Sequence, residues 1–388
     1  MLAAPVFRIV GYVASAPLGV GGAVRKARPL MSVAAVEKSK AEQFGERTLQ
    51  IINDAALALM MSIGHRTHLF DTMANLPASS AAEVAKASGL SERYVREWLG
   101  AMVTGGIVEF DAATETYRLP PEHAACLTRA ASPNNVAVTA QWVAVLGGAE
   151  DAVVDAFRHG RGVPYSAYPR FHTVMAEESR QTVVDGLLDH ILPLSYGLID
   201  KLATGIDALD IACGSGAALV TMAETFPLSH FTGVDMSAEA INAGRAEVAA
   251  RDLRNVTLVQ ADAAELWLED TYHLITAFDA IHDQARPARV LERVHAALRP
   301  GGVFLMQDIA GHTKLADNTT HPFGPFTYTI STMHCMSVSL AAGGPGLGAM
   351  WGREKAVEML NAAGFSDVRV TELPHDPINY YYIAVKPS

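Results

Sequence analysis

A glycine-bent turn is the first feature of this sequence with recognisable chemistry. Glycines at 214 and 216 allow a tight turn and a close approach of a ligand to the backbone, at the end of the run Leu209-Asp210-Ile211-Ala212-Cys213-Gly214-Ser215-Gly216. Ligands of doubly wound sheets gather at such first strand-to-helix turns. The dinucleotide fingerprint needs Gly or Ala where the chain has Leu219, and no phosphate-binding Gly-Lys-Ser/Thr follows. The turn therefore predicts a ligand without a diphosphate.

Three aspartates stand at the ends of the strands expected around this turn. Asp210 lies inside the first strand end, where its carboxylate would face the ligand crevice and attract a cation or a hydrogen-bond donor. Asp235 ends the second strand about 20 residues beyond the glycines, where an acid accepts hydrogen bonds from ribose hydroxyls. Asp262 follows the third strand and either accepts from a purine amino group or caps a helix. Together they predict places for a zwitterionic end, a ribose and an adenine.

A candidate proton-transfer group follows the fourth strand, in the run Asp279-Ala280-Ile281-His282-Asp283. A neutral hydroxyl group must lose a proton when it attacks an electrophile, and histidine can accept a proton near neutral pH. We predict His282 as a general base with Asp283 as its orienting partner; helix capping by both residues is the alternative. A metal ion held by Asp279, His282 and Asp283 is disfavoured because no further distant acid completes the site.

The elements that position these residues are short apolar strands alternating with amphipathic helices from about residue 206 onward. This pattern predicts an α/β fold, a parallel, Rossmann-like sheet with helices on both faces. Expected helices include 287–298 and 354–363. The expected strands are Ala208–Cys213, His230–Val234, Val256–Gln260, His273–Phe278, Val303–Gln307, Val368–Glu372 and Tyr380–Val385.

A helical and winged-helix domain is expected at 37–130, followed by a helical connector at 131–200 and the sheet domain at 201–388. A helix at 41–63, apolar on nearly every face and closed by Gly64, needs burial within its own subunit or against a partner. A shorter helix opens with the capping box Ser80-Ala81-Ala82-Glu83.

The second helix of the winged-helix segment begins near Ser91, and its apolar stripe includes Tyr94. Alternation at 107–119 then predicts a two-stranded wing. A DNA-reading helix would present an excess of basic side chains. Here two glutamates balance two arginines, so dimerisation or a pocket wall is the favoured role; the four residues are Glu92, Arg93, Arg96 and Glu97.

Composition limits the class of protein. Of 388 residues 50% are hydrophobic and 18% charged, and the net charge is -11, which excludes a disordered chain and disfavours nucleic acid as a partner. No apolar stretch is long enough to span a membrane, and three cysteines without a CxxC pair suit a reducing compartment, so we expect a cytoplasmic protein. Residues 1–36 contain basic but no acidic residues; a disordered or mis-started extension is favoured over a targeting leader.

Residues 206–310 resemble class I S-adenosylmethionine (SAM)-dependent methyltransferases. Residues 37–388 as a whole are similar to mycobacterial and other actinobacterial methyltransferases of unassigned substrate, which join a winged-helix N-terminus to this domain. The resemblance implies SAM as cofactor and a seven-stranded, mostly parallel sheet with an antiparallel last strand. Ala212 departs from the glycine of many members, although a small residue keeps the approach open. Four motifs carry the resemblance: 209–216, Gly233-Val234-Asp235-Met236, Gln260-Ala261-Asp262-Ala263 and Ala297-Leu298-Arg299-Pro300-Gly301-Gly302.

The same resemblance implies roles for single residues. Asp235 would take the ribose, Met236 would cover the adenine, and Asp262 with Ala263 would edge the adenine ring. Plant-type small-molecule O-methyltransferases, which also have winged-helix N-termini, carry a His–Asp pair at the place of His282 and Asp283, with the histidine as base. The methionine moiety would be lined by Asp210, Gly214 and Gly216, and the implied cofactor-binding set also contains Ala212, Ser215 and Phe278.

The segment from Gly311 to Gly352 is a long insertion between the fifth and sixth strands. Its aromatic and methionine content suits an apolar acceptor pocket or, equally, a cover for the sheet. We predict SAM-dependent O-methylation of a small-molecule acceptor by a homodimer formed through the N-terminal domain. A SAM-binding winged-helix transcriptional regulator and a silent binding scaffold are the alternatives. The candidate acceptor-binding residues are Tyr328, His334, Met336 and Trp351.

Overall fold

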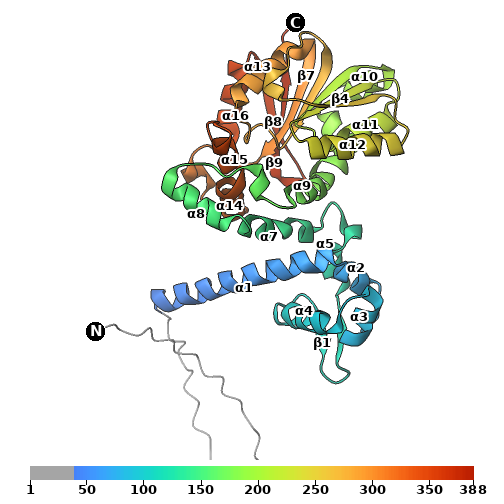
Figure 1. Ribbon diagram of the computed structural model, residues 1–388, viewed down its shortest axis with the longest axis vertical. Coiled ribbons are helices and arrows are strands. Elements are labelled where there is room, and N and C mark those ends of the chain that lie inside the picture. Colours follow the sequence, from blue (N-terminus) through green and yellow to red (C-terminus); the bar gives the residue numbers. More distant parts are fainter. Residues whose placement is uncertain (1–38) are drawn as a thin grey trace, which may run out of the picture. The chain divides into compact units, whose positions relative to one another are not determined.

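The computed structural model describes residues 39–388, so the extension expected at residues 1–36 lies outside the described part (Figure 1). A seven-stranded sheet forms the C-terminal domain, with the order β5-β4-β3-β6-β7-β9-β8. Neighbours from β5 to β7 are parallel, whereas β9 runs antiparallel to β7 and to β8. The predicted sheet with its antiparallel last strand is confirmed. The strands are β3 Asp207–Ile211, β4 His230–Asp235, β5 Val256–Gln260, β6 Tyr272–Phe278, β7 Leu298–Ile309, β8 Val368–Leu373 and β9 Asp376–Val385.

The strand β7 is longer at both ends than the predicted Val303–Gln307. At its start, an irregularity in the pairing with β6 lets the strand continue through the turn at Gly301, whose φ of 74° is left-handed. At its other end, pairing with β9 continues through Asp308 and Ile309. Asp308 is therefore a strand residue at the carboxyl edge of the sheet.

Helices cover both faces of the sheet, each over its own apolar core (Figure 1). One face packs against α10, α11 and α12, and the other packs against α13 and α16. This arrangement buries the strands on both sides, as their apolar sequences require. The bounds are α10 Leu198–Thr204, α11 Ala217–Thr225, α12 Ala238–Ala250, α13 Pro287–Ala297 and α16 Gly352–Ala362.

The N-terminal elements form a helical region with a two-stranded wing, as predicted. The capping box is present: the Ser80 backbone N–H donates to Glu83 Oε2 at 2.7 Å, and the Glu83 N–H donates to the Ser80 hydroxyl at 3.4 Å. The wing is antiparallel and pairs Glu109 with Arg118. The bounds are α1 Lys40–Arg66, α2 Leu69–Ala74, α3 Ala81–Ser88, α4 Glu92–Thr104, β1 Glu109–Asp111, β2 Thr116–Arg118 and α5 Pro121–Leu127.

Two local predictions in this region are wrong. The helix α1 does not end at Gly64 but continues to Arg66. A Cβ at position 64 would lie 2.7 Å from the rings of Phe70 and Trp98, so the glycine is needed because these rings pack closely against the helix. Tyr94 on α4 is exposed, whereas Val95, Trp98 and other members of the predicted stripe are buried. Packing against α1 and α2 selects which part of the stripe is covered.

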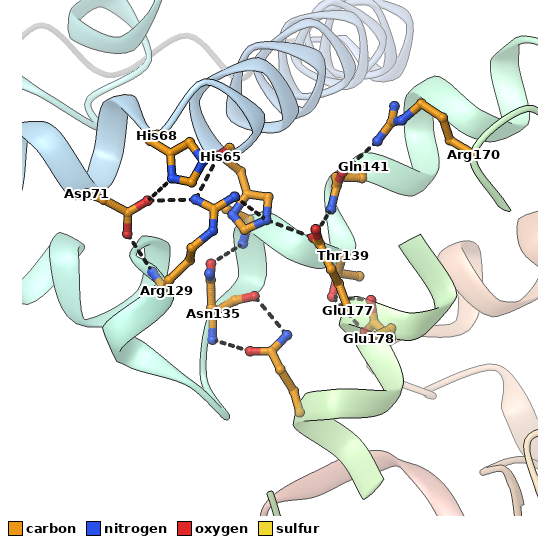
Figure 2. Close-up of polar contacts among 12 residues, drawn as sticks. His65, His68, Asp71, Arg129, Asn135, Thr139, Gln141, Arg170, Glu177 and Glu178 are labelled. Carbon is orange, nitrogen blue, oxygen red and sulfur yellow. Dashed lines mark hydrogen bonds and ion pairs between the residues drawn. The ribbon is translucent and has the colours of Figure 1, made fainter. Parts of the chain in front are cut away.

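A polar network connects the end of α1 to the connector helices (Figure 2). His65 Nε2 lies 2.9 Å from Glu177 Oε2 on α9, and Gln141 donates to the same oxygen at 2.7 Å. Arg129 donates to Asp71 at 2.6 Å. These contacts fix α9 against the winged-helix domain. The connector elements are η1 Arg129–Ala131, α6 Val136–Thr139, α7 Gln141–Gly147, α8 Glu150–His159, η2 Tyr165–Ala167, α9 Phe171–Ser179, η3 Arg180–Val184, η4 Leu187–Ile191 and η5 Leu192–Leu194.

The insertion between β7 and β8 is helical over much of its length. It packs against the connector: Val338 of the insertion shares one core cluster with Trp142 and Val174. Within residues 39–388, no helix has the length and apolar character to cross a bilayer. The insertion elements are η7 Leu315–Asn318, α14 Gly324–Ile330, η8 Ser331–Cys335 and α15 Met336–Ala341.

Candidate functional site

The strand order places a topological switch point between β3 and β6. The chain proceeds from β3 to β4 and β5 on one side, and from β6 to β7 on the other. Ligands of open α/β sheets bind in the crevice outside the carboxyl ends of the strands at such a point. The glycine turn follows β3 and the turn from Asp279 to Asp283 follows β6, so both predicted parts of the site lie at this edge.

The glycine turn has a left-handed backbone at three positions. Ala212, Gly214 and Gly216 have φ angles of 53°, 55° and 76°. This conformation costs glycine little but strains alanine, so Ala212 is the strained position of the turn. A Cβ at Gly244 on α12 would lie 2.3 Å from the Ser215 carbonyl oxygen, so this second glycine lets the turn lie close to the helix.

Asp235 holds the glycine turn with its carboxylate. Its Oδ2 accepts from the Gly214 N–H at 2.9 Å, and its Oδ1 accepts from the Ser237 N–H at 2.7 Å. A carboxylate has about four lone-pair sites, so accepting groups remain for a further donor such as a ribose hydroxyl. The residue therefore positions the turn and can bind a ligand at the same time.

Asp210 is a buried acid beside this turn. Its side chain is 3% exposed and accepts a 2.6 Å hydrogen bond from the Thr276 hydroxyl on β6. Burial raises the pKa of Asp210 to about 7; the Thr276 hydrogen bond lowers it and the charge of Asp235 raises it further. Within residues 39–388, neither Asp210 nor Asp235 forms an ion pair. Two acids without a cation suit a positively charged ligand.

The residues predicted around an adenine are held by protein contacts. Asp262 Oδ1 accepts from the Ala264 N–H at 2.8 Å and caps a short helix, while Oδ2 accepts from Arg286 at 2.6 Å. The capping alternative is thus present in the structure, and the Arg286 partner was not foreseen. Met236 is exposed at the end of β4, Ala263 is buried, and Phe278 packs in the core beneath the turn.

His282 is buried and bonded to an acid other than the predicted one. Its Nδ1 lies 2.8 Å from Asp308 Oδ1, and its side chain is 2% exposed. The predicted orienting partner, Asp283, instead accepts from the Tyr165 hydroxyl. The prediction of Asp283 as partner is wrong for a steric reason: adjacent residues of a turn project in different directions, whereas Asp308 faces the imidazole from the neighbouring strand.

Charges around His282 shift its proton affinity. Burial lowers the pKa of His282, but the interactions with Asp308 and Cys335 together outweigh it, so the pKa lies well above its usual value. Burial raises the pKa of Asp279 to about 7, although His282 acts in the opposite direction. Burial also raises the pKa of Asp283. The turn therefore holds one acid, Asp279, that can exchange a proton near neutral pH, beside an imidazole whose protonated form is stabilised.

Two of the four candidate acceptor-binding residues lie near this turn. The Trp351 indole N–H donates to Asp308 Oδ1 at 3.0 Å. His334 stacks on Phe171 with ring centroids 4.0 Å apart and contacts Tyr165 edge-on, and burial lowers its pKa to about 3. The other two candidates contact other parts of the insertion: Tyr328 accepts from Asn318 at 3.1 Å, and Met336 lies beside Gly346 and Gly348.

Two residues of the turn, Asp279 and His282, together with Asp308 of β7, are of the residue types that bind metal ions. Asp279, His282 and Asp308 bring one potential ligand atom each within 4.8 Å of one another. However, the 2.8 Å separation of His282 Nδ1 and Asp308 Oδ1 is that of a hydrogen bond, so these two groups already satisfy each other. The geometry is that of an acid–base cluster.

Sequence reasoning missed Asp308 and Tyr165. Asp308 follows the same rule as Asp210 and Asp235, an acid at the carboxyl end of a strand, and was overlooked because the predicted strand ended at Gln307. No comparable signal exists for Tyr165, which comes from the connector, 118 residues before its partner Asp283.

Two family models match the sequence. Residues 55–129 match an Rv2258c-like winged HTH domain, and residues 202–364 match a methyltransferase domain. Among curated proteins, the demethylmenaquinone methyltransferase of Listeria monocytogenes is 32% identical over 104 residues, which make up 26% of this chain and 44% of that protein. The match thus spans less than half the length of this relative.

Solved structures share the fold over most of the chain. Human N-acetylserotonin methyltransferase in complex with SAM has a TM-score of 0.66 at 16% identity, covering 92% of this chain and 100% of that chain. The mitomycin 7-O-methyltransferase MmcR has a TM-score of 0.63 at 17% identity, covering 89% and 99%. At such identities the likeness establishes the fold alone. Together with the two domain matches, it shows that the chain is a methyltransferase-fold protein in which an Rv2258c-like winged HTH domain precedes a methyltransferase domain.

Proposed function

We propose that this protein transfers a methyl group from SAM to a small-molecule acceptor, and that the methylated atom is an oxygen. The observation that carries the proposal is the pair Asp210 and Asp235, two acids without an ionic partner in the described residues, which flank a glycine turn at the switch point of a methyltransferase domain. SAM is a nucleoside with a cationic sulfonium and an amino-acid end, so it matches both the acids and the lack of a diphosphate clamp.

The residues at the glycine turn fit this cofactor. Asp210 is buried and destabilised as a carboxylate, which a bound ammonium group would relieve. Asp235 retains lone pairs for the ribose hydroxyls. Asp262 and Ala263 would edge the adenine, with Arg286 sharing the Asp262 carboxylate, and Met236 would lie over the ring. Bound SAM supplies an electrophilic methyl group on a positively charged sulfur.

The chain itself contributes position, enclosure and proton transfer. Holding an acceptor oxygen in line with the methyl group can lower the barrier by about 7 to 11 kcal/mol. Trp351 and His334, both buried, bring the insertion over the turn from Asp279 to Asp283 and restrict water there. His282, the base predicted from the sequence, is held in one orientation by Asp308 and lies beside a second group able to exchange a proton, Asp279 of the same turn.

Aromatic side chains beside the turn from Asp279 to Asp283 favour a small acceptor over a macromolecule. The ring of Tyr165 and the stacked pair of Phe171 and His334 form an aromatic wall between connector and insertion. Such surfaces bind flat apolar molecules through area burial and ring contacts. The wall therefore favours an acceptor that carries its hydroxyl on an apolar frame.

The winged-helix domain is proposed as a structural and dimerisation module. On α4, Arg93 pairs with Glu97 and Arg96 pairs with Glu92, so both basic side chains are already neutralised. This balance supports a role without DNA. The helix α1 exposes several large apolar side chains, which a second copy of the chain would cover. A cytoplasmic location stays a prediction, supported by three free cysteines.

The proposal is tested by incubating the protein with methyl-labelled SAM and a metabolite extract, followed by mass spectrometry. A labelled small-molecule product is expected. Calorimetry with S-adenosylhomocysteine and with NAD separates the cofactor question from the acceptor question. Tight binding of NAD without binding of S-adenosylhomocysteine would overturn the proposal.

A further inference from the structure

Asp279 is an acid of the site to which the sequence motifs assign no catalytic role. It is the first residue after β6, whose Ala277 pairs with Ile211 at the end of β3. The residue therefore leaves the sheet beside the glycine turn, on the cofactor side of the switch point. His282 stands three residues further along the same turn.

Accessibility separates Asp279 from its two neighbours. Its side chain is 22% exposed, whereas those of His282 and Asp308 are 2% and 0% exposed. A group that takes a proton from an acceptor must come within hydrogen-bond reach of it. Of these three residues, Asp279 is the one that an incoming molecule can contact without displacing protein atoms.

Hydrogen bonding points the same way. His282 uses Nδ1 for Asp308, and Cys335 of the insertion interacts with the same imidazole. Asp279 Oδ1, 3.8 Å from His282 Nδ1, and Asp308 Oδ2 are both buried without a hydrogen-bond partner in the described part of the chain, but of these two side chains Asp279 is the one that is partly exposed. A buried carboxylate oxygen without a donor is costly, and native proteins rarely keep one without a use.

The backbone of Asp279 is also held in an unusual conformation. Its φ of 52° is left-handed, a region that non-glycine residues seldom occupy and that concentrates at functional sites. The Asp279 N–H donates to the Gln307 carbonyl oxygen at 2.9 Å, which fixes the residue at the end of β6. The strain keeps the carboxylate at the crevice instead of letting it turn toward solvent.

We infer that Asp279 is the catalytic residue that accepts the acceptor's proton, and that His282 is a positioning residue held in place by Asp308. The inference rests on the proposed function. In the step, the acceptor O–H bond breaks and its proton forms a new O–H bond on the Asp279 carboxylate. The freed electron pair of the acceptor oxygen forms the bond to the methyl carbon, and the electrons of the sulfur–carbon bond return to sulfur. Asp279 then releases the proton to solvent.

The charged groups that face Asp279 set its behaviour. His282 stabilises its ionised form, while Asp308, Asp283 and Asp376 favour its protonated form. These groups come from its own turn and from β7 and β9, the strands beyond β6 in the sheet. Removing the His282 imidazole should therefore raise the pKa of Asp279, while the Asp279 carboxylate that accepts the proton stays in place.

The experiment compares Asp279→Asn with His282→Asn in the full-length protein, using the acceptor found with labelled SAM. Asparagine is the substitute best suited to Asp279 because it tolerates a left-handed backbone, and at position 282 its amide can still donate to Asp308. Asp279→Asn should bind S-adenosylhomocysteine within about threefold of the wild type and lose about 100-fold or more in kcat, the size of a general-base contribution. His282→Asn should keep a larger share of kcat, with the acidic limb of its pH profile moved to higher pH.

The control is Asp252→Asn. Asp252 also has a left-handed backbone, with a φ of 52°, and it lies just beyond the C-terminal end of α12, outside the site. Its turnover and pH profile should match the wild type. The inference is overturned if Asp279→Asn turns over at more than half the wild-type rate, or if His282→Asn loses 100-fold while Asp279→Asn only shifts the pH profile. A wild-type protein that binds no SAM would instead reject the proposed function, so the two failures are distinguishable.

Discussion

The hydroxyl of Thr276 on β6 donates a 2.6 Å hydrogen bond to Oδ1 of Asp210 on β3. This bond joins the two strands whose carboxyl ends border the ligand crevice. It also lowers the pKa of Asp210 and so opposes the rise in pKa that burial causes. Because the pKa of Asp210 is raised to about 7, the residue is partly protonated at neutral pH in the free protein. A ligand with a cation beside it would favour the ionised form.

Binding of S-adenosylhomocysteine, which keeps the ammonium group of SAM, should therefore strengthen as pH rises. Below the pKa of about 7, binding must first remove the Asp210 proton, so the Kd should fall by up to about tenfold per pH unit between pH 6 and 7 and level off above. Calorimetry in buffers of different ionisation enthalpy should detect proton release near pH 7. The Asp210→Asn variant should bind more weakly and without this pH dependence; an unchanged pH dependence in it would contradict the assignment.

The same acid affects stability with a defined sign. Its folded-state pKa of about 7 lies above the ordinary aspartate value of 3.8, so its favourable contribution to folding is fully present below pH 4 and is lost as pH rises through about 7. In the absence of cofactor, Asp210→Asn should raise the free energy of unfolding at pH 8 more than at pH 5. Urea unfolding at the two pH values measures this difference, and an equal effect at both would argue against a raised pKa.

Trp351 should matter for turnover through its indole N–H. It donates to the same Asp308 oxygen that bonds His282, so Trp351→Phe keeps most of the ring volume and removes one donor from that carboxylate. Loss of a hydrogen bond to a charged group costs about 1.5 to 3 kcal/mol, which corresponds to a kcat about 10- to 150-fold lower if the whole loss falls on the transition state. Cofactor affinity should not change. A kcat and a pH profile identical to the wild type would exclude this positioning role.

The strained alanine of the glycine turn predicts opposite effects of two small substitutions. Ala212→Gly relieves a left-handed alanine and should raise the free energy of unfolding by up to about 1 kcal/mol. Gly214→Ala introduces a Cβ into open space at a φ of 55°, so it should lower stability by about 1 kcal/mol through the backbone alone. Urea unfolding compares the two. A stabilising Gly214→Ala would show that the turn is not left-handed in solution.

The acid–base geometry of the turn also predicts independence from metal ions. His282 Nδ1 and Asp308 Oδ1 already satisfy each other through their hydrogen bond. Treatment with EDTA, followed by removal of the chelator, should leave turnover unchanged, and added Mg²⁺ or Mn²⁺ should not increase it. Loss of turnover on chelation with recovery on adding one of these ions would assign Asp279, His282 and Asp308 to a metal site.

The regular part of the fold could be predicted because it is encoded locally. Alternating apolar strands and amphipathic helices fix the sheet, and the glycines fix the turn after β3. The same local rule placed Asp210 and Asp235 at strand ends. It would also have placed Asp308, had the strand been extended by one residue.

Contacts between distant segments could not be predicted in this way. Gly64 carries the local signal of a helix end, but the rings of Phe70 and Trp98 pack against it and the helix continues. Tyr165 reaches Asp283 from the connector, and Arg286 reaches Asp262 across the crevice edge. Such pairings depend on how the elements pack, and no spacing along the chain records them.

The exposed face of α1 predicts self-association. Ile52, Leu59 and Ile63 are each more than 40% exposed and recur at intervals of seven and four residues, so they form one stripe along the helix. A stripe of this kind is unfavourable in water and is expected to be covered by the same stripe of a second copy. We expect a dimer by light scattering at micromolar concentration. The double variant Ile52→Glu/Leu59→Glu should be monomeric, because it would bury two unpaired charges in the interface.

The matched control for this variant is Asn53→Glu, which adds a charge at an exposed position next to the stripe. It should leave the dimer intact. If the double variant remains dimeric, the interface lies elsewhere in the protein; if the wild type is monomeric, the apolar stripe of α1 has a different partner. Binding of S-adenosylhomocysteine should persist in the monomeric variant, because Asp210, Asp235 and the glycine turn all belong to the sheet domain.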